Sequence, residues 1–310
     1  MGAILIAGAG GFVGARLAAD LRAAGIPVVT AGRGHGLDLC FDLHDEPGRL
    51  LRALPCPVDD AVVACGIASV DACSREPARA RLVNVERTRI LLAALLEHGI
   101  RPIFLSSDLV FGDGALPHRE GAPRRPLCAY GRFKAEIEDF LWRTGRPAVV
   151  IRAAKLVNPA DPTRCPLVTL ARRARAGLPV RAARDQWITP TFCGDLSRLI
   201  RTLLPRPGSH LVHVAGDTPT TRFALAHLVA GRAGHPEAVR GCGLAELRLP
   251  AERPRNARLD NRRLREVYGV APTALGELLR SALEAAGGSR IPGPRGRART
   301  LRPPPAAAAG

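Results

Sequence analysis

The sequence predicts an α/β protein with a doubly wound parallel sheet and a second, smaller C-terminal lobe. Three observations support this fold class. Short apolar segments rich in β-branched residues alternate with helical patterns over the first half of the chain, as in successive βαβ units. A glycine-rich turn follows the first apolar segment. After Asn158 the alternation breaks, which indicates that a second structural unit begins there.

The first strand, turn and helix have the Rossmann arrangement that binds a dinucleotide. Residues 2–7 form the apolar strand, and a helical pattern runs on to Ala24. Glycines between them let the backbone approach a pyrophosphate, which rests on the helix N-terminus. The alternative is a tight turn without a ligand. We expect cofactor contacts from Gly8, Gly10, Gly11, Phe12, Val13 and Gly14.

The second strand, residues 27–31, ends close to Arg33. An acidic residue at this edge would bind a ribose 2′-hydroxyl and favour NAD, whereas an arginine can contact a 2′-phosphate. Arg33 therefore predicts NADP (as NADPH) in preference to NAD, and the alternative is a solvated loop arginine. Asp42 and Leu43 follow a further short run and are expected beside the adenine.

The third strand is predicted over 60–65, so Cys65 and the following Gly66 are expected to contact the cofactor. A helix over 76–98 follows, with an apolar stripe on one face. Asn84 lies within this helix. Because a buried asparagine needs hydrogen-bond partners, we expect it to brace the backbone of the site and assign it to cofactor binding.

The fourth strand, residues 102–105, leads to Ser107 at the carboxyl edge of the sheet. A linker over 112–128 then precedes a helix that carries Tyr130 and Lys134, whose spacing of four places both on one face. An ammonium lowers the pKa of a nearby phenol, which is ordinarily about 10. A serine hydroxyl can bind a substrate carbonyl while the phenol protonates it. These residues predict a site that reduces a ketone.

The rarity of lysine and tyrosine strengthens this interpretation. Among 45 basic residues only Lys134 and Lys155 are lysines, and the two tyrosines are Tyr130 and Tyr268. Arginine stands at nearly every other basic position, so its absence at 134 indicates that a compact ammonium is required there. The alternative is an ordinary amphipathic helix face. We take Ser107, Tyr130 and Lys134 as the candidate catalytic residues.

The remaining elements define the predicted domains. A fifth strand covers 147–152; later come a basic helix and a short strand within 160–190, a helix over 191–204, a strand over 211–215, and helices over 221–234 and 274–286. The predicted division has a dinucleotide-binding domain over 1–158 completed by about 191–216, a lobe over 159–190 and 217–287, and a disordered Gly/Pro/Arg tail over 288–310.

Composition argues against several other classes of protein. No apolar run approaches the ~18 residues of a membrane span, and no secretory signal is visible, so we expect no membrane association. The eight cysteines are scattered and none forms Cys-x-x-Cys, which favours reduced thiols in the cytoplasm and no metal site. The net charge of +17 includes five arginines in the tail and lacks aromatic interleaving, so we expect no nucleic-acid partner.

Several motifs, taken in order, resemble the extended short-chain dehydrogenase/reductases. Within them the chain is most similar to the dTDP-4-dehydrorhamnose reductase family of sugar-nucleotide 4-ketoreductases, over residues 3 to about 287. The segments that carry the resemblance are the glycine turn, Val70-Asp71, Val83-Asn84, residues 106–111, Pro117–Glu120, Tyr130–Lys134, Asp185-Gln186, Pro190-Thr191, Arg253-Pro254 and Leu259-Asp260.

The resemblance implies NAD(P)H-dependent reduction of the 4-keto group of a 4-keto-6-deoxy sugar attached to a nucleoside diphosphate. It implies catalysis by the serine, tyrosine and lysine named above. Independently of the resemblance, the two long helices predicted after the third and fourth strands could pair across a homodimer, and the oligomeric state is left open. Leu109, His118 and Trp187 depart from the family pattern near the expected sugar, so they leave the hexose open. The implied substrate-binding residues are Asp108, Val110, Phe111, Gln186, Trp187 and Thr189.

Two other functions remain open at this point. One is a nucleotide-sugar epimerase or dehydratase that holds NAD tightly. The other is a non-catalytic regulatory subunit that binds a cofactor, and the presence of the serine, tyrosine and lysine argues against it. Because many enzymes with different activities share this fold, the fold alone does not distinguish between these functions.

Overall fold

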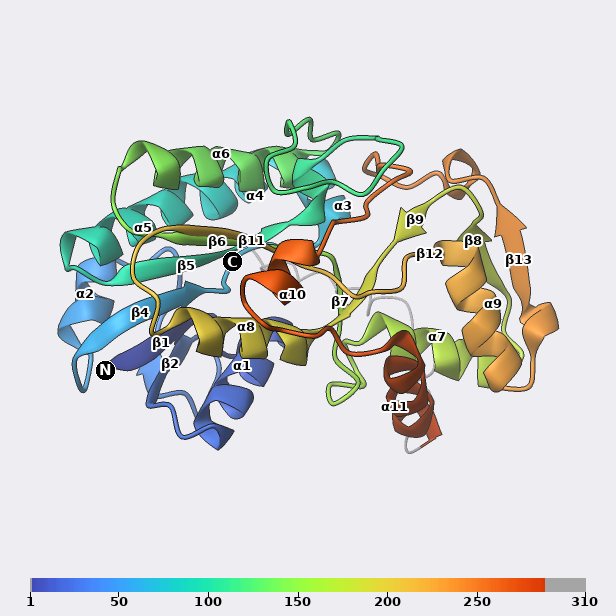
Figure 1. Ribbon diagram of the computed structural model, residues 1–310, viewed down its shortest axis with the longest axis horizontal. Helices are drawn as coiled ribbons and strands as arrows, with labels where there is room; N and C mark the ends of the chain where they lie inside the picture. Colours follow the sequence, from blue (N-terminus) through green and yellow to red (C-terminus); the bar gives the residue numbers. More distant parts are fainter. Residues whose placement is uncertain (1, 288–310) are drawn as a thin grey trace, which may run out of the picture.

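The computed structural model describes residues 2–287, and its centre is a seven-stranded parallel sheet (Figure 1). The strand order is β11-β6-β5-β4-β1-β2-β3, so the chain moves outward first in one direction from β1 and then in the other. This confirms the predicted doubly wound sheet. The strands are β1 (Ala3–Ala7), β2 (Val28–Gly32), β3 (Leu39–Cys40), β4 (Val58–Val63), β5 (Arg101–Ser107), β6 (Val149–Ala153) and β11 (His210–Val214).

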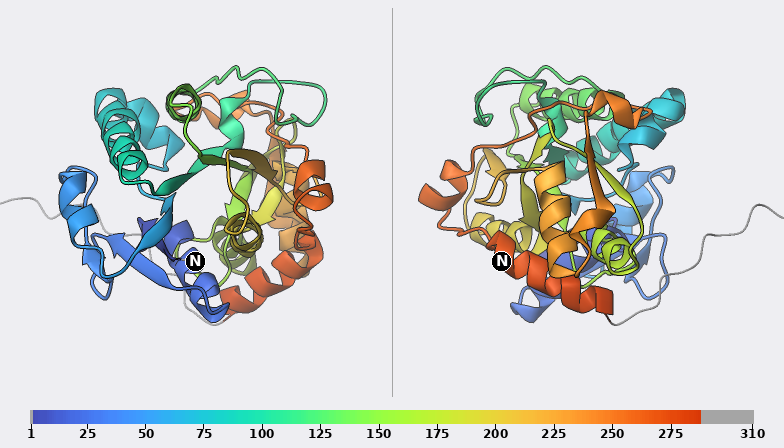
Figure 2. Two further views of the ribbon diagram at one scale, coloured as in Figure 1. Left: turned by 60° about the vertical axis from the view of Figure 1, so that its left-hand side comes forward. Right: turned by 90° about the vertical axis from the view of Figure 1, so that its right-hand side faces the viewer.

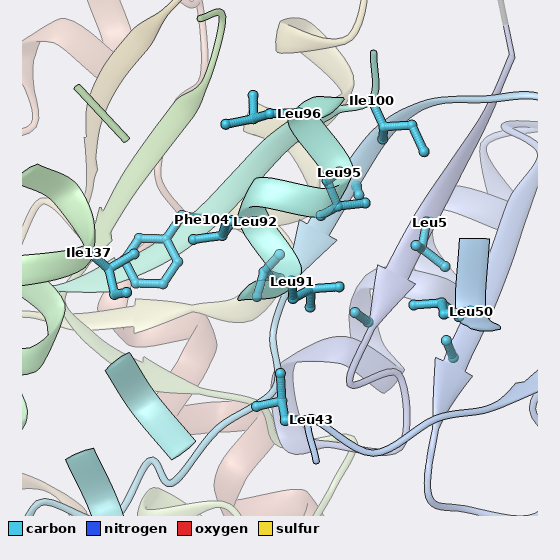
Figure 3. Close-up of a cluster of buried hydrophobic side chains, with 14 of the residues drawn as sticks. Leu5, Leu43, Leu50, Leu91, Leu92, Leu95, Leu96, Ile100, Phe104 and Ile137 are labelled. Carbon is cyan, nitrogen blue, oxygen red and sulfur yellow. The ribbon is translucent and has the colours of Figure 1, made fainter. Parts of the chain in front are cut away.

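The alternation of side chains along β1 divides the core between the two faces of the sheet. Ile4 and Ile6 pack on one face against α1 (Phe12–Ala23) and α8 (Cys193–Leu203). Leu5 points to the other face, where Figure 3 shows it with leucines of the covering helices. Those helices are α2 (Pro47–Arg52), α5 (Thr88–Glu97) and α6 (Ala129–Arg143).

The predicted helix over 76–98 is interrupted by a wider turn. After α3 (Val70–Arg75), the chain forms α4 (Pro77–Arg81), a π-helical segment η1 (Leu82–Arg87) and then α5. The Thr88 hydroxyl donates a hydrogen bond to the Val83 carbonyl at 2.9 Å. The prediction of one continuous α-helix over this stretch is therefore wrong. Asn84 lies in the π-helical turn, and such turns are common at functional sites.

The second half of the chain adds three two-stranded sheets beyond the main one. β7 (Lys155–Val157) pairs with β10 (Pro190–Phe192), β8 (Val180–Ala183) with β13 (Val239–Cys242), and β9 (Trp187–Ile188) with β12 (Thr220–Thr221). The helix predicted over 191–204 begins at Cys193 because β10 occupies 190–192.

Three helices of this half share a core around Val168, Val229 and Leu278. They are α7 (Pro166–Arg175), α9 (Arg222–Arg232) and α11 (Leu275–Gly287), and α11 lies against α7 in Figures 1 and 2. The short helix α10 (Arg262–Glu266) returns to the main sheet beside β11. We refer to the elements from α7 to β9 together with β12, α9, β13 and α11 as the small lobe.

Within residues 2–287, no helix combines the length and the apolar character needed to cross a membrane. The predicted disordered tail over 288–310 lies outside the described residues.

Candidate active site

A cleft of about 990 Å³ lies at the carboxyl ends of β4, β5 and β6 and extends under the small lobe. Ligands of doubly wound proteins bind at this edge, where the strand order reverses. The small lobe forms the opposite wall. Of the residues predicted for the site, those that line the cleft are Phe12, Val13, Cys65, Gly66, Asn84, Ser107, Asp108, Tyr130, Lys134 and Gln186.

The glycine turn between β1 and α1 has the geometry of a phosphate cradle. Gly8 has φ +95°, and a side chain at Gly14 would overlap the Gly8 carbonyl oxygen. Gly11 caps α1 without any side-chain hydrogen bond to the first N–H groups of the helix. A Cβ on Gly10 would meet only Leu37, at 3.9 Å, and the Arg164 guanidinium donates a hydrogen bond to the Gly10 carbonyl at 3.2 Å, so a cation lies beside the turn. These features fit the pyrophosphate of a nicotinamide dinucleotide.

Asn84 holds the backbone at the end of β4, as expected. Its side-chain oxygen accepts from the Ile67 N–H at 2.8 Å, and its amide donates to the Ile67 carbonyl at 3.0 Å. Gly66, just before this clamp, has φ +131°. Burial raises the pKa of the neighbouring Cys65 thiol to about 12, so this cysteine is not a thiolate at neutral pH.

Ser107 is the last residue of β5, and its Cα partner in β6 is Ala153. Its hydroxyl donates to Asp108 Oδ1 at 2.8 Å and accepts from the Leu109 N–H at 3.2 Å, which caps the short helix η2 (Asp108–Val110). Burial raises the pKa of Asp108 to about 6, against the opposing effects of the Ser107 hydrogen bond and the Lys155 charge. Asp108 is therefore mostly ionised at neutral pH and accepts the hydrogen bond from the Ser107 hydroxyl.

Tyr130 and Lys134 lie on successive turns of α6 and face the same cleft as Ser107. The helix can approach η2, directly after β5, this closely because Gly131 has no side chain, and a Cβ there would overlap the Leu109 carbonyl oxygen. The Lys134 ammonium donates to the Leu105 carbonyl at 2.8 Å and lies 5.6 Å from the centre of the Tyr130 ring.

The ionisation of this pair differs from the expectation. Burial, followed by the charge of Asp108, raises the pKa of Tyr130 above its ordinary value, so the predicted lowering by Lys134 is wrong for this structure. Burial lowers the pKa of Lys134 to about 8. At neutral pH Tyr130 is thus a neutral phenol, which is the form that can donate a proton.

A buried carboxylate joins the elements that carry these residues. Glu138, one turn after Lys134, is fully buried and accepts a hydrogen bond from the Ser106 hydroxyl. Arg152 of β6 pairs with the same carboxylate at 2.6 Å, and Arg124 approaches it at 3.2 Å. This network fixes α6 against β5 and β6, and so fixes Tyr130 relative to the catalytic edge.

Four residues predicted to bind substrate lie elsewhere. Val110 and Phe111 are fully buried, and Phe111 stacks on His118 with ring centres 4.5 Å apart, so neither lines the cleft. Trp187 is 41% exposed, beneath the Arg258 guanidinium. Thr189 is buried and its hydroxyl has no hydrogen-bond partner in the described part of the chain. Of the predicted substrate-binding residues, Asp108 and Gln186 thus line the cleft and the other four do not.

The residues predicted for the adenine end lie past the cleft, beside β2 and β3. Arg33 is exposed along most of its side chain and pairs with Asp42 at 3.4 Å. Leu43 packs into the core instead of facing solvent. Arg33 is thus available to a ligand, whereas Leu43 has a structural role in this arrangement.

Several basic residues of the cleft were not singled out by the sequence. Lys155 begins β7, and Arg222 begins α9 and hydrogen-bonds Gln186. Arg253 pairs with Asp71 at 2.7 Å. In a chain so rich in arginine these positions carried no signal, whereas the scarcity of lysine could have identified Lys155. Among residues 2–287 no cluster of three or more His, Cys, Asp or Glu side chains is placed to hold a metal ion.

Known proteins resemble this chain in sequence and in fold. A protein of *Streptomyces antibioticus* named "Probable dTDP-4,6-dihydroxy-2-methyloxan-3-one 4-ketoreductase" is 32% identical over 86% of this chain and 90% of its own length. A *Thermus thermophilus* UDP-glucose 4-epimerase in complex with NAD superposes with a TM-score of 0.81 at 21% identity, over 93% of this chain and 99% of its own.

A *Bacillus anthracis* dTDP-4-dehydrorhamnose reductase in complex with NADP superposes with a TM-score of 0.79 at 20% identity, over 90% of this chain and 97% of its own. The model of the RmlD substrate binding domain family matches residues 2–287. The chain therefore belongs to the RmlD substrate binding domain family, within the extended short-chain dehydrogenase/reductases.

Proposed function

We propose that this protein uses NADPH to reduce the 4-keto group of a 4-keto-6-deoxy nucleotide sugar. The observation that carries the proposal is the convergence of Ser107, Tyr130 and Lys134 in one cleft, beside a glycine turn shaped for a dinucleotide. The *S. antibioticus* relative is named as a 4-ketoreductase of a dTDP-linked substrate, which supports the same reaction class here.

The nicotinamide cofactor, when bound, supplies the hydride. In the mechanism we propose, Tyr130 donates its proton to the carbonyl oxygen as the alkoxide forms, because its raised pKa keeps it protonated. Ser107 donates a hydrogen bond to the same oxygen. Lys134 then stabilises the phenolate that remains, and its pKa of about 8 leaves it largely charged at neutral pH.

Charges at the two ends of the site support the choice of ligands. Arg33 is exposed and its ion pair with Asp42, at 3.4 Å, leaves guanidinium N–H groups free for a 2′-phosphate, which favours NADPH. At the small-lobe end, Arg181 lines the cleft. We assign this end to the diphosphate of the nucleotide sugar.

We further propose a cytoplasmic homodimer without nucleic-acid or membrane partners. All eight cysteines are free thiols, as in a reducing compartment. Ile90 of α5 and Trp142 of α6 are exposed large side chains on neighbouring helices and supply an apolar surface for the dimer. Light scattering of the purified chain tests the oligomeric state.

The decisive experiment follows NADPH oxidation with dTDP-4-keto-6-deoxy sugars, with mass spectrometry of the product. Consumption of one NADPH per gain of two hydrogens supports the proposal. Turnover without net NADPH consumption, by protein that retains NAD through purification, would indicate an epimerase or dehydratase instead. Cofactor binding without turnover across a panel of keto sugars would indicate a regulatory subunit.

A further inference from the structure

Lys155 is the second of the two lysines of the chain, and like the first it lines the cleft. Its ammonium forms no hydrogen bond or ion pair with any side chain or carbonyl between residues 2 and 287. Burial, reinforced by the neighbouring charge of Arg222, lowers its pKa. Lys155 is half-buried in the wall of the cleft, so its unpaired ammonium is available to a ligand group that accepts hydrogen bonds.

The strand register places this ammonium near the reacting end of the substrate. Ala153 is the Cα partner of Ser107 across β5 and β6, and Lys155 follows it by two residues. Two residues of extended chain span about 7 Å, which is comparable to the width of one sugar ring. Lys155 therefore faces the sugar and not the distant nucleotide.

Asp108 decides what kind of group Lys155 binds. The two residues share the cleft and influence each other's charge, yet no ion pair joins them within the described chain. A carboxylate or phosphate of the ligand would be repelled by Asp108. A neutral hydroxyl suits both, because it can accept from the ammonium and donate to the carboxylate at the same time.

The Ser107 hydroxyl has one proton, and it is donated to Asp108 at 2.8 Å. Ser107 can donate to the substrate carbonyl only when another donor satisfies Asp108. That donor must lie within one hydrogen bond of the carbonyl, which places it on the adjacent ring carbon.

We propose that Lys155 and Asp108 together bind the sugar hydroxyl next to the keto carbon. This hydroxyl then replaces Ser107 as the hydrogen-bond donor to Asp108, and Ser107 is free to donate to the carbonyl oxygen. Lys155 is then a specificity-determining residue for keto sugars that carry this hydroxyl. The inference rests on the proposed ketoreductase function and identifies the sugar hydroxyl that the same site recognises.

The test compares two substrates, a dTDP-4-keto-6-deoxyhexose with its 3-hydroxyl and the 3-deoxy counterpart. We expect the wild type to favour the hydroxylated sugar by about 100-fold in kcat/KM. Lys155→Met should lower kcat/KM about 30-fold for that sugar and leave the 3-deoxy sugar nearly unchanged. Lys155→Gln keeps an N–H donor and should restore part of the preference.

Two measurements separate recognition from folding. Lys155→Met should unfold at the same temperature as the wild type or higher, because it replaces an unpaired, half-buried ammonium with an apolar side chain. Arg143→Met removes an exposed charge on α6 and should leave both substrates unaffected. An equal loss for both sugars in Lys155→Met overturns the inference alone, whereas a wild type that reduces neither sugar overturns the ketoreductase proposal as well.

Discussion

Ser106 and Arg152 are Cα partners across β5 and β6, and both bind the buried carboxylate of Glu138. Three elements of the site thus share one acidic group. Its loss would leave the Arg152 guanidinium buried without its partner, which is unfavourable.

Glu138→Gln is expected to lower the free energy of unfolding by about 3–5 kcal/mol, measured by urea denaturation. Glu136→Gln on the same helix removes a partly exposed pair with Arg81 and should change it by less than about 1 kcal/mol. Equal effects of the two substitutions would show that the buried network does not hold α6 in place.

Tyr130→Phe should lower kcat about 10²–10⁴-fold, because the ring remains but its proton is lost. The affinity for NADPH, measured by fluorescence titration, should stay close to that of the wild type. Tyr268→Phe is the matched control, since that hydroxyl bonds His210 on β11 at 3.0 Å, away from the cleft. Turnover that survives in Tyr130→Phe would remove the tyrosine from the mechanism.

The pH dependence of kcat/KM should have two limbs. Asp108, with a pKa of about 6, must be ionised to accept the substrate hydroxyl, so activity falls as the pH drops below about 6. Lys134, with a pKa of about 8, must be charged, so activity falls as the pH rises above about 8. Rates measured from pH 5 to 9 check this profile, and Asp108→Asn should abolish the acidic limb while the alkaline limb remains.

Arg33→Leu should raise the KM for NADPH about tenfold and change the KM for NADH little, because a charge-assisted contact to the 2′-phosphate is lost. Steady-state kinetics with both cofactors provide the measurement. Arg49→Leu removes another exposed arginine near the same edge, on α2, and serves as the control. A similar rise in KM for NADPH and for NADH would argue against a contact between Arg33 and the 2′-phosphate.

The elements with a strong local pattern were predictable from the sequence. The apolar strands and the glycine turn follow from side-chain period and from the backbone freedom of Gly8 and Gly14. Tyr130 and Lys134 were found because their helical spacing is local and both residue types are rare. The sequence also placed Asn84 against the backbone of the site.

The failures came from effects that depend on tertiary packing. Val110 and Phe111 adjoin Ser107 and Asp108 in sequence, but the turn of η2 directs them into the core. The neutral state of Tyr130 reflects burial, which spacing does not reveal. Arg222 and Arg253 reach the cleft from positions more than 90 residues after Tyr130, and nothing local distinguishes them from the other arginines.

The π-helical segment η1 makes the structure of the site sensitive to the deletion of a single residue within that segment. Each residue of an α-helix turns the chain by about 100°. Deleting a single residue between Leu82 and Arg87 would allow a regular helix, but it would rotate Asn84 away from Ile67 and free the loop after β4. Evolution of this protein can therefore exchange side chains in η1 more readily than it can shorten it.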